Sequence, residues 1–184
     1  MSQIYIDQEI YTGAPRDDRG RSPVEMQTYA LLDSLGISYQ RLDHGATATV
    51  DDCFDVERLL GIEICKNLFL CNAAKTQYYL LMLPGEKKYR APVISKQLQT
   101  SRLSFADAAS MGKYLHITPG SVSVLGLMND TEHAVRLLID KDVMSHSYIG
   151  CHPCVNTSSL KLRLEDVLNR FLPYTGHTPE FVEL

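Results

Sequence analysis

Two apolar segments, ICKNLFLCN (residues 64–72) and QYYLLMLP (residues 77–84), constrain the fold most strongly. A turn around Lys75 separates them, so they are predicted to pair as neighbouring strands. Alternation divides the first segment into two faces, with Ile64, Lys66, Leu68 and Leu70 on one and Cys65, Asn67, Phe69 and Cys71 on the other. Because both faces are largely apolar, we predict that this segment is an interior strand.

The other predicted elements mix helices and strands without strict alternation. Helical patterns occupy residues 22–36, 51–61, 93–98, 105–113 and 164–172, and strand-like or loop-like segments occupy residues 37–44, 120–127, 134–140, 147–153 and 155–162. Ser22 can cap the first helix and Gly36 can end it, while Pro173 is expected to end the last one. This order predicts an α/β protein of the α+β type, with a mixed, mostly antiparallel sheet and helices packed on it.

The length of 184 residues suits one domain. We divide the chain into a polar N-terminal lead-in (residues 1–21), a single domain (22–172) and a C-terminal tail (173–184). No apolar run approaches the ~18 to 20 residues that span a bilayer, and the first residues do not form a secretory signal. The expected location is therefore the cytoplasm, with no membrane partner.

The net charge of −4 argues against broad, non-specific coating of nucleic acid. A local basic run is nevertheless present between residues 86 and 102, where Glu86 is the single acid. Its cations are Lys87, Lys88, Arg90, Lys96 and Arg102. This run is either a solvated surface or a face that contacts phosphates.

Lys66 and Asn67 are unusual inside an apolar strand, because a buried charge or amide is costly unless it is paired or faces a cavity. One interpretation places Lys66 at the frayed start of the strand, with its ammonium group in solvent. The other places it on a pocket wall, where it would hold a phosphate, a carboxylate or a developing oxyanion.

The segment TPGSVSVLGL is too apolar for an ordinary surface loop. It contains four small residues that could border a ligand: Gly120, Ser121, Ser123 and Gly126. Glycines would let backbone N–H groups approach that ligand closely, whereas the simpler alternative is a strand with a bulge.

The segment YIGCHPCVNTS raises three alternatives: a redox dithiol, half of a metal site, or a functional histidine. The residues after Cys154 alternate like a strand, whereas a redox Cys-x-x-Cys pair normally precedes a helix. A zinc site would need a second ligand pair, and the spacing of the other histidines is not diagnostic. The remaining candidates are therefore Gly150, His152 and Pro153, and no metal or cofactor is expected.

Several of these segments together resemble one family. ICKNLFL, PGSVSVLGLMND and GCHPCVNTSSL follow one another as in the YbaK/prolyl-tRNA-synthetase-associated editing domains. LDHGATATV, with His44 and Thr49, and LSFAD are also similar to that family. The resemblance covers roughly Pro23 to Leu172, and within the family the chain most resembles free-standing prolyl-tRNA deacylases of the PrdX type.

The resemblance implies a barrel-like mixed sheet and hydrolysis of a mischarged aminoacyl-tRNA, chiefly Ala-tRNA(Pro). Alternatives are Cys-tRNA(Pro), another small aminoacyl ester, or a non-catalytic module that binds tRNA or a synthetase. The implied partners are the acceptor end of tRNA(Pro) and, as a second candidate, prolyl-tRNA synthetase. Lys66 and His152 would be catalytic, and the substrate would contact Asn67, Gly120, Ser121, Ser123, Gly126, Gly150 and Pro153. The basic run would then contact the acceptor stem.

Overall fold

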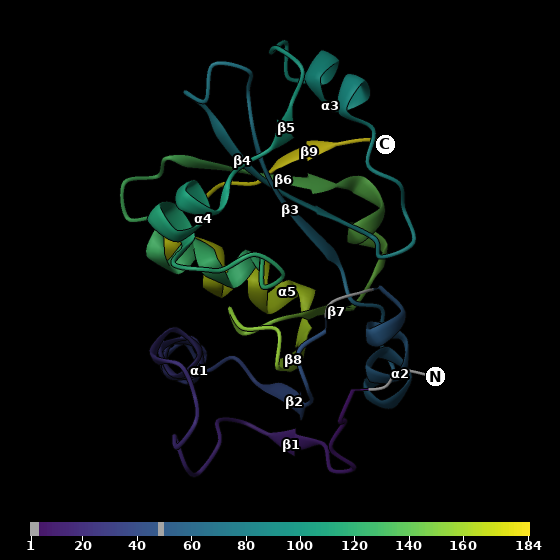
Figure 1. Cartoon of the computed structure of the whole chain (residues 1–184), viewed down its shortest axis with the longest axis vertical. Helices are drawn as coiled ribbons and strands as arrows, with labels where there is room; N and C mark the ends of the chain where they lie inside the picture. Colours follow the sequence, from purple (N-terminus) through teal and green to yellow (C-terminus); the bar gives the residue numbers. More distant parts are fainter. Residues whose placement is uncertain (1–3, 48–49) are drawn as a thin grey trace.

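The computed structural model describes residues 4–47 and 50–184 and contains two sheets with helices packed around them (Figure 1). The smaller sheet has the order β1-β2-β8-β7 and is antiparallel throughout. Its strands are β1 (Tyr11–Thr12), β2 (Tyr39–Asp43), β7 (Tyr148–Cys151) and β8 (Ser158–Arg163). The lead-in therefore supplies β1, an edge strand of this sheet.

The larger sheet has the order β5-β3-β4-β6-β9. Its strands are β3 (Lys66–Cys71), β4 (Tyr78–Leu83), β5 (Ser104–Phe105), β6 (Val135–Asp140) and β9 (Glu180–Val182). β4 pairs with β3 antiparallel, as predicted, and with β6 parallel, so this sheet is mixed. The predicted fold class is confirmed, except that the two sheets remain separate and do not close into a barrel.

The helices are α1 (Pro23–Ser34), α2 (Val50–Leu60), α3 (Ala91–Gln97), α4 (Ala108–Leu115), α5 (Leu164–Asp166) and α6 (Leu172–Thr175), with the 3₁₀ helices η1 (Val124–Asn129) and η2 (Lys141–Ser145) and the π-helix η3 (Val167–Phe171). α1 begins as predicted, because the Ser22 hydroxyl accepts the Glu25 N–H at 3.2 Å. α4 begins three residues later than predicted: Ser104 and Phe105 form β5, and Asp107 caps the helix. No helix in the described ranges is both long and apolar enough to cross a bilayer.

The C-terminal helical segment does not end at Pro173 as predicted. α5, η3 and α6 run on continuously to Thr175, and Gly176 ends them with a φ of +73°. The π-helical turn shifts the hydrogen-bonding pattern just before the proline, which has no N–H to donate. Beyond Gly176, β9 pairs with β6, and His177 Nε2 lies 3.1 Å from Asp130 Oδ2. The tail is therefore built into the larger sheet.

β3 has two apolar faces, as predicted, but its outer edge is largely open. Leu70 packs in one cluster with Leu81 and Leu83, and Phe69 packs in the other with Met82. On the outer side, however, β5 pairs only with Leu70 and Cys71. The prediction of a fully interior strand is therefore wrong for its first residues, because the neighbouring strand is only two residues long.

The two sheets meet beside this open edge. Ile64, just before β3, forms a parallel bridge to Gly150 of β7. A Cβ on Gly150 would lie 2.6 Å from Ile62 Cδ1, closer than real Cβ contacts come, and 3.0 Å from the backbone atom Ile64 Cα, tighter than most of them. Only glycine permits the backbones to approach this closely.

Candidate active site

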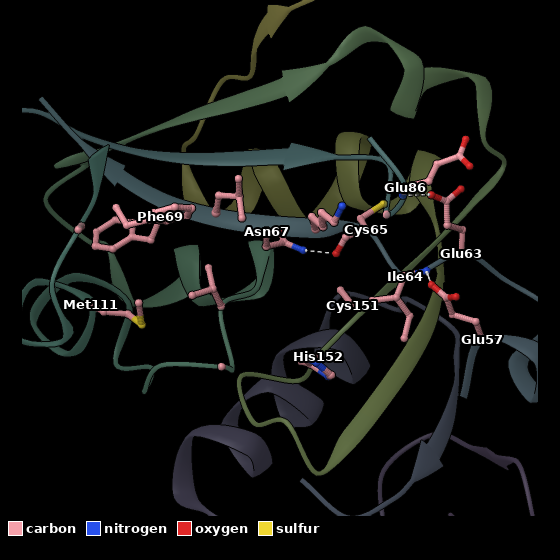
Figure 2. A pocket seen from close by; sticks show the side chains of 17 residues that line it. Glu57, Glu63, Ile64, Cys65, Asn67, Phe69, Glu86, Met111, Cys151 and His152 are labelled. Carbon is pink, nitrogen blue, oxygen red and sulfur yellow. Dashed lines mark hydrogen bonds between the residues drawn. The ribbon is translucent and has the colours of Figure 1, made fainter. Parts of the chain in front are cut away.

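A cavity of about 550 Å³ runs along the open edge of β3 (Figure 2). One end is apolar and includes Phe69, Met111 and Val122, and the other end is acidic. The middle brings together four residues that the sequence singled out: Lys66, Asn67, Cys151 and His152. Gly120 lies on the wall as well. Lys66 and His152, which are far apart in the chain, thus share one site.

The backbone of Asn67 faces this cavity. Cys65 donates its N–H outward to the Gly150 carbonyl at 3.0 Å, and the Phe69 carbonyl accepts the Ala106 N–H at 2.9 Å. In an antiparallel pair, every second residue directs its N–H and C=O away from its partner strand. Asn67 lies between these two positions, so its main-chain N–H and C=O point out through the open edge.

The side chain of Asn67 is held by its own strand. Its amide nitrogen donates to the Cys65 carbonyl at 3.0 Å, which fixes the plane of the amide. The amide oxygen is buried and has no hydrogen-bond partner among the residues described. Buried acceptors are rarely left unpaired, so this oxygen marks a place where a ligand or water completes the site.

Lys66 is the first residue of β3 and is half-buried. Its Nζ donates to the backbone carbonyl of Lys87 at 3.1 Å. One hydrogen bond leaves two ammonium donors, and no carboxylate within 4 Å is present in the described part of the chain. Lys66 thus begins the strand, as the first interpretation has it, but its ammonium group binds a carbonyl and its side chain lines the cavity.

His152 is a neutral histidine with a defined tautomer. Its Nδ1 lies 2.9 Å from the Ser158 carbonyl oxygen, which can only accept, so Nδ1 carries the proton. Burial, with a smaller contribution from the neighbouring His44, lowers the pKa of His152 to about 4. At neutral pH its Nε2 is therefore a free acceptor on the cavity wall.

A second histidine supports this arrangement. His44 Nε2 lies 2.9 Å from the Ser159 hydroxyl, and its Nδ1 lies 2.7 Å from the Gly45 carbonyl. Nδ1 must donate to the carbonyl, so Nε2 accepts the hydroxyl proton of Ser159. The Ser159 oxygen in turn lies 3.4 Å from His152 Nδ1. Burial keeps both imidazoles neutral by lowering their pKa, and the hydrogen bonds fix their tautomers. Thr49, which the sequence grouped with His44, lies outside the described residues.

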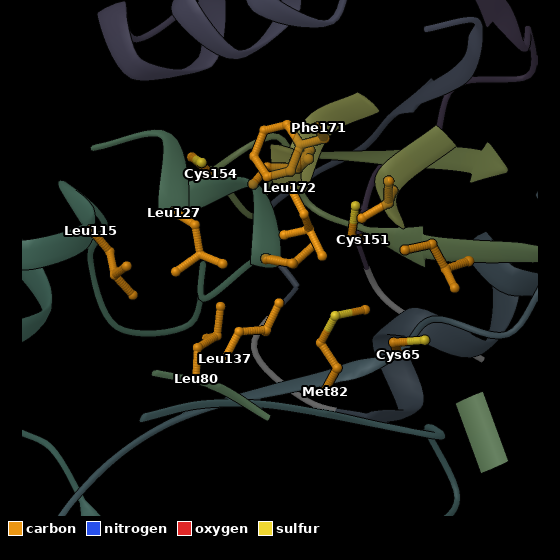
Figure 3. Packing of buried hydrophobic residues seen from close by; sticks show 14 of the residues in the cluster. Cys65, Leu80, Met82, Leu115, Leu127, Leu137, Cys151, Cys154, Phe171 and Leu172 are labelled. Carbon is orange, nitrogen blue, oxygen red and sulfur yellow. The ribbon is translucent and has the colours of Figure 1, made fainter. Parts of the chain in front are cut away.

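The Cys-x-x-Cys pair lies in the hydrophobic core beside the cavity (Figure 3). Both thiols are free and at most 2% exposed. Burial raises the pKa of the Cys154 thiol to about 12 and raises that of Cys151 as well, the opposite of what a redox dithiol requires. Among the residues described, no group of three or more His, Cys, Asp or Glu side chains is arranged for a metal ion.

We expect both thiols to resist alkylation in the folded protein at pH 7.5, because they are buried and protonated. Iodoacetamide labelling followed by peptide mass mapping measures this directly, with the urea-unfolded protein as the fully reactive control. Labelling of Cys151 or Cys154 at the unfolded rate would restore the dithiol interpretation.

The remaining predicted pocket residues do not line the cavity. Ser123 is fully buried, and its hydroxyl accepts the Leu125 N–H at 3.2 Å as the cap of η1, where the sequence predicts a strand or a loop. Ser121 is also buried, and Gly126 packs against Ile117. Pro153 is buried as well, directly after His152. Of residues 120–126, only Gly120 and Val122 line the cavity.

The acidic end of the cavity was not anticipated from the sequence. It is formed by Glu57, Glu63 and Glu86. Glu57 accepts the Ile64 N–H at 2.8 Å, and Glu63 accepts the Glu86 N–H at 3.2 Å, so both also fix the backbone at this end of the cavity. Burial raises the pKa of Glu57, and the nearby Glu63 adds to this.

The basic run divides into one paired and four unpaired cations. Lys87 contacts Asp140 at 2.7 Å and Asp142 at 2.6 Å, so its charge is already compensated. The exposed members without a carboxylate partner in the described ranges are Lys88, Arg90, Lys96 and Arg102. They remain candidates for phosphate contact.

Comparisons with known proteins point to one family. The family model described as an aminoacyl-tRNA editing domain matches residues 44–169. The "Prolyl-tRNA editing protein ProX" of Acetoanaerobium sticklandii is 32% identical over 155 residues, covering 84% of this chain and 94% of that protein. The "Prolyl-tRNA synthetase associated domain-containing protein 1" of Danio rerio is 29% identical over 163 residues, covering 86% and 87%.

Solved structures support the fold alone. The chain matches a structure described as that of a candidate trans-editing enzyme for prolyl tRNA synthetase with a TM-score of 0.65 at 13% identity, covering 89% of this chain and 98% of the other. It matches the hypothetical protein APE2540 with a TM-score of 0.64 at 18% identity, covering 86% and 98%. On the family match and the ProX identity, the chain belongs to the aminoacyl-tRNA editing domain family.

Proposed function

We propose that this protein is a trans-editing deacylase that hydrolyses the ester bond of mischarged tRNA(Pro), with Ala-tRNA(Pro) as its substrate. The observation that carries the proposal is the cavity itself. It places a lysine without a carboxylate partner, an unpaired amide oxygen and a neutral histidine along one open strand edge, in a chain of the editing family. The relative named a prolyl-tRNA editing protein supports the choice of tRNA.

In the proposed reaction, a water oxygen adds to the ester carbonyl, the bond to the ribose oxygen breaks, and that oxygen takes up a proton. Lys66 stabilises the negative charge that develops on the carbonyl oxygen. The outward N–H of Asn67 is a second donor at the same edge. His152 Nε2 accepts a hydrogen bond from the attacking water and orients it.

Neither a covalent intermediate nor a nucleophilic side chain is required. The thiols of Cys65 and Cys151 lie at the cavity but are protonated, because burial raises the pKa of both. An aminoacyl ester is already activated, so orientation of water and charge stabilisation suffice. The acidic end of the cavity suits the α-ammonium group of the aminoacyl ester, which is the cationic part of this substrate.

Selection of alanine over proline follows from size. A pocket that fits a methyl group excludes a larger ring by steric clash, whereas a synthetase site built for proline cannot exclude alanine equally well. We expect kcat/KM for Ala-tRNA(Pro) to exceed that for Pro-tRNA(Pro) by about 100-fold. The measurement is release of radiolabelled amino acid from Ala-, Cys- and Pro-tRNA(Pro) under identical conditions.

The outcomes of this experiment separate the alternatives. Faster release from the cysteinyl ester would keep the chemistry and replace the substrate. Release of proline as fast as alanine would refute size selection. If no ester is hydrolysed although tRNA still binds, the protein is a recruitment module and the proposed function fails.

A further inference from the structure

Phe105 is an exposed aromatic side chain at the cavity. Its side chain is 66% exposed. Among the large exposed apolar side chains in the described ranges, Phe105 is the one that also lines the cavity. It belongs to β5, where it pairs with Leu70 of β3. The next residue, Ala106, donates its N–H to the Phe69 carbonyl at 2.9 Å, which fixes the backbone beside Phe105. An exposed aromatic ring that also lines a cavity is placed to contact a ligand that enters the cavity.

Tyr89 supports the Phe105 ring. The two ring centroids are 6.0 Å apart and the planes are inclined at 58°, a favourable aromatic contact. Tyr89 is itself half-buried against the cluster that contains Leu70 and Leu81. Together, Phe105 and Tyr89 form a fixed aromatic shelf beside the cavity.

The chain segment that carries this shelf is positively charged. Residues 87–106 contain no Asp or Glu. Burial raises the pKa of Tyr89, and the positive charge of Arg102 partly offsets this rise. Arg102 therefore lies close to Tyr89. Lys88 and Arg90 flank Tyr89 in the sequence and are exposed. Elsewhere most exposed cations are already paired, as in Arg136–Glu180 and Lys141–Glu183.

From this combination we propose that the aromatic shelf stacks a nucleobase of the single-stranded 3′ end of the tRNA, while Arg102 and its neighbours contact the adjoining phosphates. Exposed aromatics interleaved with unpaired cations are typical of single-stranded nucleic-acid surfaces, because each base offers a flat face and each linkage a negative charge. A double-stranded stem would not offer a free base face. The inference rests on the proposed function in that it takes tRNA as the substrate, and it specifies how the 3′ end reaches the cavity.

The test compares Phe105→Ala with Phe105→Trp, and with Phe181→Ala as the matched control on an exposed phenylalanine outside the cavity. Two quantities are measured: the Kd for uncharged tRNA(Pro) by filter binding, and kcat and KM for Ala-tRNA(Pro). We expect Phe105→Ala to weaken binding about 10- to 100-fold and to raise KM, since base stacking is worth that much. Phe105→Trp should restore both values, and Phe181→Ala should leave them unchanged.

Salt dependence separates stacking from charge. Arg102→Gln should reduce the slope of log Kd against log salt concentration by about 1, the value of one phosphate contact. Phe105→Ala should leave the slope unchanged. Unaltered binding and KM in Phe105→Ala, or failure of tryptophan to restore them, would overturn the stacking proposal. So would a defect in Phe105→Ala that appears only when prolyl-tRNA synthetase is added, because the shelf would then be a protein contact.

The failure of this inference and that of the proposed function are distinguishable. A wild-type protein that hydrolyses no ester, with tRNA binding that still depends on Phe105, would refute the enzyme and retain the shelf. A wild-type protein that hydrolyses Ala-tRNA(Pro), with a Phe105→Ala variant equal to it in Kd and KM, would retain the enzyme and refute the shelf.

Discussion

Lys66→Ala is expected to lower kcat/KM for Ala-tRNA(Pro) by about 100- to 1,000-fold, the usual cost of removing one oxyanion donor from an enclosed site. The lysine keeps two donors free for the substrate, because its single hydrogen bond goes to the Lys87 carbonyl. The expected loss is mainly in kcat if the ammonium acts on charge that develops in the transition state. Single-turnover deacylation with saturating enzyme measures that step.

The same substitution should leave the fold intact. Lys66 begins β3 and contributes one side-chain hydrogen bond, so its removal should cost about 1 kcal/mol of unfolding free energy. Urea unfolding of Lys66→Ala checks this. Lys141→Ala, which removes an exposed ion pair with Glu183, is the control for a general effect of charge on tRNA binding. A Lys66→Ala variant that retains activity within about threefold would refute the role of Lys66 in stabilising the oxyanion.

The two faces of β3 could be predicted from the sequence, but its open edge could not. Alternation is a local property, and it correctly separated Phe69 from Leu70. Whether the outer edge is covered depends on the length of β5, which lies more than 30 residues further along the chain. A two-residue strand leaves no periodic signal. The edge on which the site is built therefore follows from tertiary structure alone.

The candidate site was predictable where a residue type conflicted with its surroundings. Lys66 and Asn67 stood out because polar groups are costly in an apolar strand, and both line the cavity. Ser121 and Ser123 matched the pattern equally well but lie in the interior, where Ser123 caps a 3₁₀ helix. A serine that caps and a serine that binds look alike in sequence, since both accompany glycine in tight turns.

The apolar wall was missed for the opposite reason. Phe69, Met111 and Val122 look like ordinary core residues, and their sequence contains no signal that they border a cavity. The sequence pattern predicts Phe105 at the start of a helix, whereas Phe105 lies in β5 and is exposed. Hydrophobicity predicts burial, and it does not distinguish a core from a pocket or from a binding surface.

His152→Ala is expected to lower kcat/KM by about 100-fold, since Nε2 is the acceptor that orients the attacking water. His152→Gln keeps an acceptor on a side chain of similar reach, so it should retain more activity than the alanine variant. Both variants should bind uncharged tRNA like the wild type, because the histidine contacts the ester and not the stem. Equal activity in His152→Ala and the wild type would show that the ring has no role in orienting water.

The pH dependence provides a second, independent test of the same residue. With a pKa of about 4, His152 is neutral from pH 5 to 8, so kcat/KM corrected for spontaneous hydrolysis should show no inflection near pH 6.5 from this residue. Protonation of His152 should lower activity as pH falls through about 4, where a proton occupies Nε2. A wild-type inflection near pH 6.5 that disappears in His152→Gln would contradict the neutral, buried state.

The free energy of unfolding should also depend on the protonation of His152. The pKa of His152 is lower in the folded than in the unfolded chain, so between about pH 6.5 and 4 the unfolded chain binds more protons. Stability is therefore complete above pH 6.5 and declines as pH falls toward 4. His152→Gln should flatten this decline without abolishing it, because burial also lowers the pKa of His44. Urea unfolding at pH 7 and pH 5 measures the difference, and an equal decline in variant and wild type would mean that His152 titrates alike in both states.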